Sequence, residues 1–181
     1  MQEQNIIYII GDNASGKTRY LKNIIADAKK NNYKVVTNIP GDAANYAVNK
    51  ERLTLLKSLN NRLVEKIVIE KNIETSRDAY IEKLFRLFYS IGDILVIDEL
   101  DINLTIQNII DITAALSEIR KTWKKIYING YSEYITRAFT DIDTETGTEL
   151  YTPKIIYVDE KMQTHEVTED NECEYFDKIR G

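Results

Sequence analysis

The stretch NIIYIIGDNASGKT, residues 5–18, decides the fold of this 181-residue chain. It begins with an almost wholly apolar run that ends at Gly11, and such a run is typical of a strand buried on both faces of a parallel sheet. From Lys17 onward the apolar residues follow helical spacing instead. The stretch therefore predicts a strand, a glycine-rich turn and a helix, in that order.

The turn matches the pattern G-x-x-x-x-G-K-[ST]. Its glycines let backbone N–H groups surround phosphate oxygens, and the following helix adds the positive end of its dipole. We expect Lys17 to reach the β- and γ-phosphates of ATP, and Thr18 to be a ligand of Mg²⁺. The pattern does not distinguish ATP from GTP. The predicted phosphate-binding residues are Gly11, Asp12, Asn13, Ala14, Ser15, Gly16, Lys17, Thr18 and Arg19.

A second acidic motif, ILVIDELD, occupies residues 94–101. Four apolar residues precede Asp98, which places a carboxylate at the carboxyl end of a buried strand, where open α/β sheets bind ligands. We expect Asp98 to hold Mg²⁺ through water, and Glu99 to polarise the water that attacks the γ-phosphate. The catalytic residues predicted are thus Glu99 and Lys17. The alternative is a strand that simply ends in acidic residues that keep the protein soluble. The presence of the phosphate-binding motif in the same chain makes this alternative less favoured.

The remaining periodicity predicts one domain over residues 1–181, in which strands alternate with helices. This alternation indicates a P-loop NTPase of the α/β class, with a mainly parallel sheet flanked by helices and a C-terminal β-hairpin. Further strands are predicted at 33–39 and 125–129, helices at 47–68, 76–90 and 105–122, a short helix in SEYITRAF capped by Ser132, and a hairpin over 153–170 that turns near residues 160–162.

The charge and the cysteine content of the chain indicate which partners and which cellular compartment to expect. The net charge is −5, and residues 141–181, the predicted hairpin and tail, carry twelve acidic against four basic residues. Such a segment is either a solvated surface or a docking surface for a basic partner, and it disfavours unaided DNA binding. Nucleic acid would be contacted only indirectly. The single cysteine, Cys173, excludes an internal disulfide, and neither a membrane span nor a signal peptide is predicted, so we expect a cytoplasmic protein.

Three stretches follow one another over residues 76–137: SRD at 76–78, DELDINLT at 98–105 and YINGYSEYITR at 127–137. In this order and spacing they resemble ABC-type ATPases of the RecF, SMC and OLD kind. Ser76, Arg77 and Asp78 stand at the positions of the Ser-Gly-Glu signature of that family, about twenty residues before the acidic strand end. DELDINLT is similar to the acidic run that follows the family's strand. YINGYSEYITR resembles the segment that carries the family's switch histidine, and it places Tyr131 at that position.

The resemblance implies a nucleotide bound between two copies, or between this chain and a partner, with Ser76, Arg77 and Tyr131 at the nucleotide. Arg77 replaces the signature glycine and hinders a close backbone approach, while Tyr131 has no imidazole. No glutamine lies between the phosphate-binding loop and the signature. Arg77 is then either a solvated residue at a helix start or an arginine finger, and Tyr131 is either a packed aromatic or a γ-phosphate sensor.

Three functions stay open on the sequence. The first is an ATPase subunit, homodimeric or joined to an unidentified effector, whose nucleotide-dependent association drives a larger complex; a defence role follows from family analogy alone. The second is a small-molecule kinase, although no arginine-rich lid is evident. The third is a regulatory subunit that binds nucleotide without hydrolysing it, as the altered signature and switch suggest.

Overall fold

The computed structural model describes residues 5–11, 16–40, 45–130, 141–142, 149–151 and 153–180. Its main sheet has six strands in the order β2-β3-β4-β1-β7-β8, parallel except for the β7–β8 pair. This architecture confirms the predicted fold class. The strands are β1 (Ile6–Gly11), β2 (Val35–Thr37), β3 (Ile94–Ile97), β4 (Lys125–Asn129), β7 (Lys154–Val158), β8 (Thr164–Val167) and a separate antiparallel pair, β5 (Asp141–Ile142) and β6 (Glu149–Tyr151).

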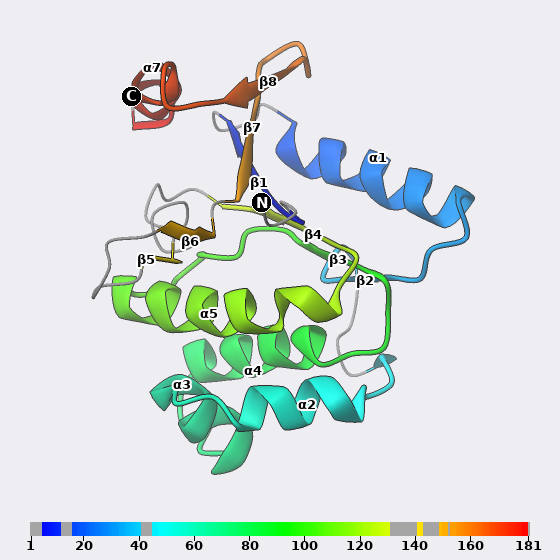
Figure 1. Ribbon diagram of the computed structural model, residues 1–181, viewed down its shortest axis with the longest axis vertical. Coiled ribbons are helices and arrows are strands. Elements are labelled where there is room, and N and C mark those ends of the chain that lie inside the picture. Colours follow the sequence, from blue (N-terminus) through cyan, green and yellow to red (C-terminus); the bar gives the residue numbers. More distant parts are fainter. Residues whose placement is uncertain are drawn as a thin grey trace.

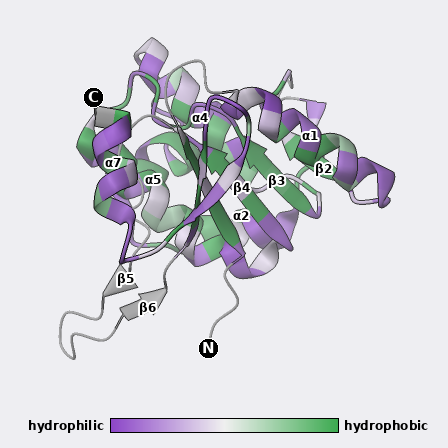
Figure 2. Cartoon of the chain, turned by 90° about the horizontal axis from the view of Figure 1, so that it is seen from above, coloured by the Kyte–Doolittle hydropathy of each residue, from purple (hydrophilic) through white to green (hydrophobic). Residues whose placement is uncertain are grey.

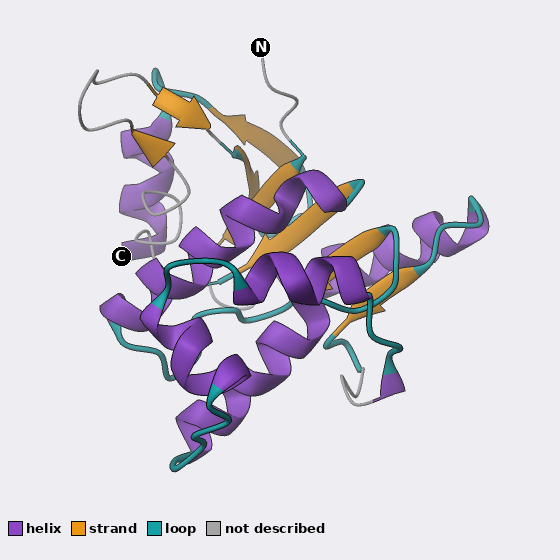
Figure 3. Cartoon of the chain, turned by 60° about the horizontal axis from the view of Figure 1, so that its bottom comes forward, coloured by secondary structure: helices purple, strands orange, loops and turns teal. Residues whose placement is uncertain are grey.

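Helices cover both faces of the sheet. Helix α1 lies on one face, whereas α5, α4 and α2 are layered on the other (Figures 1 and 3). The helices are α1 (Lys17–Lys30), α2 (Lys50–Lys57), α3 (Arg62–Val64), the π-helix η2 (Glu65–Ile69), α4 (Ser76–Phe88), α5 (Ile106–Ile119), the 3₁₀-helix η3 (Arg120–Thr122) and α7 (Glu172–Arg180).

Strand β1 shows how the two layers are built. Successive side chains of a strand point to opposite faces. Ile6, Tyr8 and Ile10 therefore belong to the core formed with α4 and α5, while Ile7 and Ile9 belong to the core formed with α1. All five are buried. Apolar colouring accordingly runs along the central strands in Figure 2, whereas the outer surfaces of the helices are hydrophilic.

The predicted helix over 47–68 is wrong in its continuity. The structure has α2, a break, and then α3 followed by the π-helix. Asn61 explains the break, because its side chain accepts hydrogen bonds from the backbone N–H groups of Leu63 and Val64 and starts a new helix. The same side chain donates to the carbonyl of Asp111 on α5, at 2.8 Å. A contact between layers therefore fixes where the second helix begins.

Helix α5 also departs from its prediction. The helical spacing of Ile106, Ile109, Ile110, Thr113 and Leu116 predicts that all five face the core. Ile109, Thr113 and Leu116 are buried as expected, but Ile106 and Ile110 are 51% and 45% exposed. The C-terminal hairpin is confirmed, with β7 pairing along β1 in parallel. The sequence did not predict α7, whose Phe176 packs into the core. The short helix predicted from Ser132 lies outside the described residues.

A buried arginine fastens the amino ends of two central strands. Arg52, 4% exposed, places its guanidinium 3.6 Å from the centre of the Trp123 ring. The guanidinium also donates to the carbonyls of Ser90, Gly92 and Thr122, just before β3 and β4. Burial lowers the pKa of Arg52, with Asp93 opposing this. The burial of this arginine is tolerated because its guanidinium N–H groups donate hydrogen bonds to carbonyl oxygens.

In the part of the chain that the structure describes, no helix combines the length and the apolar character needed to cross a bilayer.

Candidate nucleotide-binding site

Lys17 and the two motif glycines frame the phosphate-binding loop. Gly11 ends β1, and Gly16 caps α1 with a φ of 88°, a left-handed conformation that glycine adopts at no steric cost. The Nζ atom of Lys17 donates to the carbonyl oxygen of Gly11 at 2.8 Å, so the side chain turns back toward the end of β1. Lys17 is only 6% exposed. The lysine is therefore held at the point where β1 and α1 come together.

Thr18 and Asp98 meet across 80 positions of sequence. The Oγ1 atom of Thr18 donates to Oδ2 of Asp98 at 2.9 Å. Thr18 is in the first turn of α1, and Asp98 directly follows β3, whose end lies two strands from β1. The structure thus brings the predicted metal ligands together.

The environment of Asp98 fits a cation. Its other carboxylate oxygen, Oδ1, is buried and has no hydrogen-bond partner among the described residues. Burial raises the pKa of Asp98, and Glu99 adds to the rise, while hydrogen bonds from Thr18 and Asn129 oppose it. A carboxylate and a hydroxyl are the hard oxygen ligands that Mg²⁺ takes, together with substrate phosphates. The residues present therefore suit Mg²⁺ held jointly by protein and nucleotide.

No larger metal centre accompanies this pair. Among the described residues there is no group of three or more His, Cys, Asp or Glu side chains placed to hold a metal ion. His165, the one histidine, has its Nε2 atom 2.9 Å from the carboxylate of Asp159 on the hairpin. It lies on β8 with its side chain 39% exposed, so it pairs with Asp159 at the surface of the hairpin. Cys173 is exposed.

Glu99 adopts a left-handed backbone conformation, with a φ of 53°. A non-glycine residue in this region costs about 1 kcal/mol or more, so the surrounding structure must hold it. The N–H of Glu99 donates to Oδ1 of Asn129 at 2.6 Å, and the N–H of Leu100 donates to the carbonyl of Asn129 at 3.0 Å. From the other side, the hydroxyl of Tyr80 donates to the carbonyls of Glu99 and Leu100, at 2.8 and 3.1 Å.

Asn38 is a second asparagine that sequence reasoning missed. It follows β2, and its amide group pairs with the backbone of Asp98: Nδ2 donates to the carbonyl and Oδ1 accepts from the N–H, both at 2.8 Å. Asn38 and Asn129 thus hold Asp98 and Glu99 from the two strands that flank β3. The available signal in the sequence was a polar residue at or directly after the end of an apolar run. This signal does not show which residue each asparagine contacts, because that depends on the order of the strands in the sheet.

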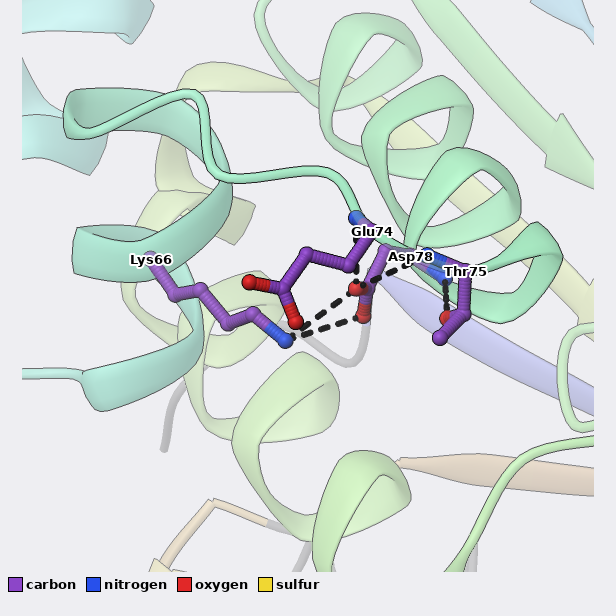
Figure 4. Close-up of polar contacts among 4 residues, drawn as sticks. All are labelled: Lys66, Glu74, Thr75 and Asp78. Atoms are coloured by element: carbon purple, nitrogen blue, oxygen red, sulfur yellow. Dashed lines mark hydrogen bonds and ion pairs between the residues drawn. The ribbon is translucent and has the colours of Figure 1, made fainter.

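The start of α4 forms a separate polar cluster (Figure 4). Thr75 caps the helix by accepting from the N–H of Asp78 at 3.0 Å. The carboxylate of Asp78 accepts from the N–H groups of Glu74 and Thr75 and pairs with Lys66, whose Nζ is 3.1 Å from Oδ2. Burial tends to raise the pKa of Asp78, but these donors outweigh burial and the pKa is lowered. At the signature-like position of Asp78, the structure thus has a capping residue.

Ser76 and Arg77 are exposed at the first turn of α4. The Nε atom of Arg77 donates to the carbonyl of Asn103 at 2.9 Å. Neither of the two interpretations of Arg77 anticipated this contact, in which the side chain is tied to the loop after Glu99. The contact of Ser76 and Arg77 with a partner's nucleotide stays a prediction.

The other predicted site residues fall in three groups. Arg19 is described and lies exposed on α1. Asp12, Asn13, Ala14 and Ser15, in the middle of the loop, lie outside the described residues. Tyr131 also lies outside them, so its proposed sensor role is not tested.

The turn of the C-terminal hairpin reaches the phosphate-binding loop. Met162 lies in the β7–β8 turn and itself has a φ of 62°. Its Cγ atom is 3.2 Å from the position that a Cβ on Gly16 would occupy. A side chain at Gly16 would thus meet both backbone strain and Met162, so the turn packs against Gly16.

Three structural neighbours define the class of fold. The RNase-L Inhibitor superposes with a TM-score of 0.60 at 13% identity, over 98% of this chain and 37% of that one. An ATP-binding subunit of an ABC transporter gives 0.52 at 14% identity, over 98% of this chain and 84% of that one. A dimeric bacterial ABC transporter cassette gives 0.52 at 11% identity, over 93% and 88%.

The chain thus has the fold of ABC-type P-loop ATPase domains. It spans only about a third of the length of the RNase-L Inhibitor. No protein-family model matches the sequence, and no curated protein is similar to it. The neighbours do not favour the RecF, SMC and OLD branch over other ABC-type ATPases.

Proposed function

We propose that this protein is an ATP-binding and ATP-hydrolysing subunit of the RecF, SMC and OLD-like kind, whose nucleotide-dependent association gates a larger complex. The observation that carries the proposal is the Thr18–Asp98 contact. It joins the first turn of α1, which begins with Lys17, to an aspartate whose other carboxylate oxygen is buried and has no hydrogen-bond partner among the described residues. A strand end that served only solubility would leave its carboxylate in water.

The residues divide the chemistry as follows. Lys17 and the loop amides bind the β- and γ-phosphates, and Thr18 and Asp98 hold Mg²⁺, which when bound neutralises charge on the phosphate oxygens. Glu99 orients water and accepts its proton as it attacks the γ-phosphate. Strand β4 separates β1 from β3, which sets the strand of Glu99 about 10 Å from that of the loop.

The exposed start of α4 is the proposed surface through which the chain associates with a partner. Ser76 and Arg77 are open to a second copy or to a partner protein, as the resemblance requires. One of the structural neighbours is a dimeric cassette, which supports this arrangement. The proposed partner is a second copy of this chain or an effector protein, with a defence role for the complex. We propose a cytoplasmic location, and contact with nucleic acid only through the complex.

The test is the solution mass of Glu99→Gln with and without Mg²⁺-ATP. The substitution removes the base while preserving size, so ATP should bind without turnover and the mass should double. Lys17→Ala in the same background should abolish the shift, whereas Lys22→Ala, exposed on the same helix, should leave it intact. A Glu99→Gln protein that binds ATP but stays monomeric, alone and with candidate partners, would contradict nucleotide-driven association.

Two alternatives are separated by simple assays. A small-molecule kinase would phosphorylate a member of a nucleoside or sugar panel, and its ATP consumption would depend on that acceptor. A non-hydrolysing regulatory subunit would bind ATP with no turnover in the wild-type chain, even beside its partner. The hydrogen bonds that fix the backbone of Glu99, the residue directly after Asp98, favour hydrolysis over both.

A further inference from the structure

We propose that Tyr80 is a positioning residue for Glu99, and that helix α4 is the element that sets the geometry of the segment from Glu99 to Asn103. The inference rests on the proposed role of Glu99 and adds the regulation of that site. It starts from the backbone of Glu99, whose left-handed conformation needs support on both sides.

The supports of Glu99 come from two different layers. Asn129, on the sheet, accepts from the N–H of Glu99. Tyr80, on α4, donates to the carbonyls of Glu99 and Leu100, at 2.8 and 3.1 Å. These contacts fix the peptide groups on both sides of Glu99 and so the direction in which its side chain leaves the backbone. Of these two residues, Tyr80 lies on the element that begins at the signature-like position.

The chemistry of Tyr80 suits a permanent donor. The residue is half-buried, and burial raises the pKa of its phenol, with Asp101, Glu99 and Asp98 adding to the rise. The hydroxyl therefore keeps its proton at every working pH. Phenylalanine at this position would keep the ring and lose only the donor, leaving two backbone carbonyls without this partner.

The same helix holds the far end of the segment. Arg77 donates to the carbonyl of Asn103, which also has a left-handed conformation, with a φ of 58°. Arg77 and Tyr80 are three residues apart and share a face of α4. One helical face thus contacts the segment near Glu99 and again at Asn103. Any movement of the exposed helix start, where Ser76 would meet a partner, is passed to the segment that carries Glu99.

The experiment compares Tyr80→Phe and Arg77→Ala with wild type by amide hydrogen exchange and steady-state ATP hydrolysis. Tyr89→Phe, at the other end of α4, is the matched control. We expect faster exchange over residues 99–104 in Tyr80→Phe, with β3 and the control unchanged. Its kcat should fall about 10-fold while the affinity for ATP stays within twofold of wild type. Arg77→Ala should accelerate exchange mainly near residues 102–104.

The outcomes separate this inference from the proposed function. Unchanged exchange over 99–104 in both variants overturns it, whether or not the chain hydrolyses ATP. If wild type hydrolyses ATP and Tyr80→Phe changes exchange but not kcat, the positioning role is overturned as well. If wild type has no turnover, the proposed hydrolysis fails, and the exchange data alone decide whether α4 sets the segment.

Discussion

Two aspartates close to one helix show how differently the chain treats a buried carboxylate. Asp78, at the start of α4, accepts from two backbone N–H groups and pairs with Lys66, and its pKa is lowered. Asp98, at the end of β3, leaves one buried oxygen without a partner among the described residues, and its pKa is raised. A carboxylate whose hydrogen bonds are satisfied stabilises the fold, whereas a buried carboxylate oxygen without a hydrogen-bond partner marks a candidate binding site.

The largest effect expected from this comparison is on activity. Asp98→Asn should lower Mg²⁺-dependent ATP turnover at least about 100-fold, because it removes a charged ligand of the metal. Asp78→Asn removes no ligand of the metal and only loosens the start of α4, so it should lower turnover per folded molecule by no more than about 10-fold. Steady-state hydrolysis at saturating Mg²⁺, corrected for the folded fraction, measures both. Equal losses in the two variants would remove the functional distinction between the aspartates.

The next effect is on stability. Asp78→Ala should lower the free energy of unfolding by about 2 kcal/mol, because it strips charged hydrogen bonds from the start of α4. Glu82→Ala is the control on the same helix: Glu82 pairs with Arg86 at the surface, and its loss should cost less than about 0.5 kcal/mol. Urea denaturation measures both, and a cost no greater than that of the control would show that the Asp78 cluster is not stabilising.

The pH dependence of Asp78 sharpens the comparison further. A carboxyl whose pKa is lower in the folded state contributes stability above its unfolded pKa of about 4 and loses it as the pH falls through the folded value. The stability difference between wild type and Asp78→Asn should therefore be full at neutral pH and shrink in strong acid. Urea midpoints from pH 7 downward would show this. A difference that is constant with pH would contradict the lowered pKa.

The smallest effect has the opposite sign. Without nucleotide and Mg²⁺, Asp98→Asn should raise the free energy of unfolding by about 1 kcal/mol, since it replaces a buried, incompletely bonded carboxylate with a neutral group. Thermal unfolding of the metal-free protein measures the gain. Addition of Mg²⁺-ATP should stabilise wild type and leave Asp98→Asn nearly unchanged. A variant destabilised as strongly as Asp78→Ala would show that Asp98 is structural.

Much of the site could be predicted because its chemistry is local in sequence. The spacing of Gly11, Gly16, Lys17 and Thr18 predicts a strand end followed by a helix start, and the apolar run before Asp98 predicts that this carboxylate follows a second strand. The supporting residues could not be predicted in this way. Asn38 and Asn129 act on Asp98 and Glu99 because β2 and β4 are the neighbours of β3, and that order appears only in the folded sheet.

The sequence by itself determined the strand–loop–helix unit, the acidic strand end and the mainly parallel α/β class, since each depends on the hydrophobic pattern and steric freedom of a few consecutive residues. The tertiary structure decided the break at Asn61, the exposure of Ile106 and Ile110, and the hold of Tyr80 on Glu99. These depend on which elements become neighbours. Adjacency is set by the packing of whole layers, which no local window of sequence contains.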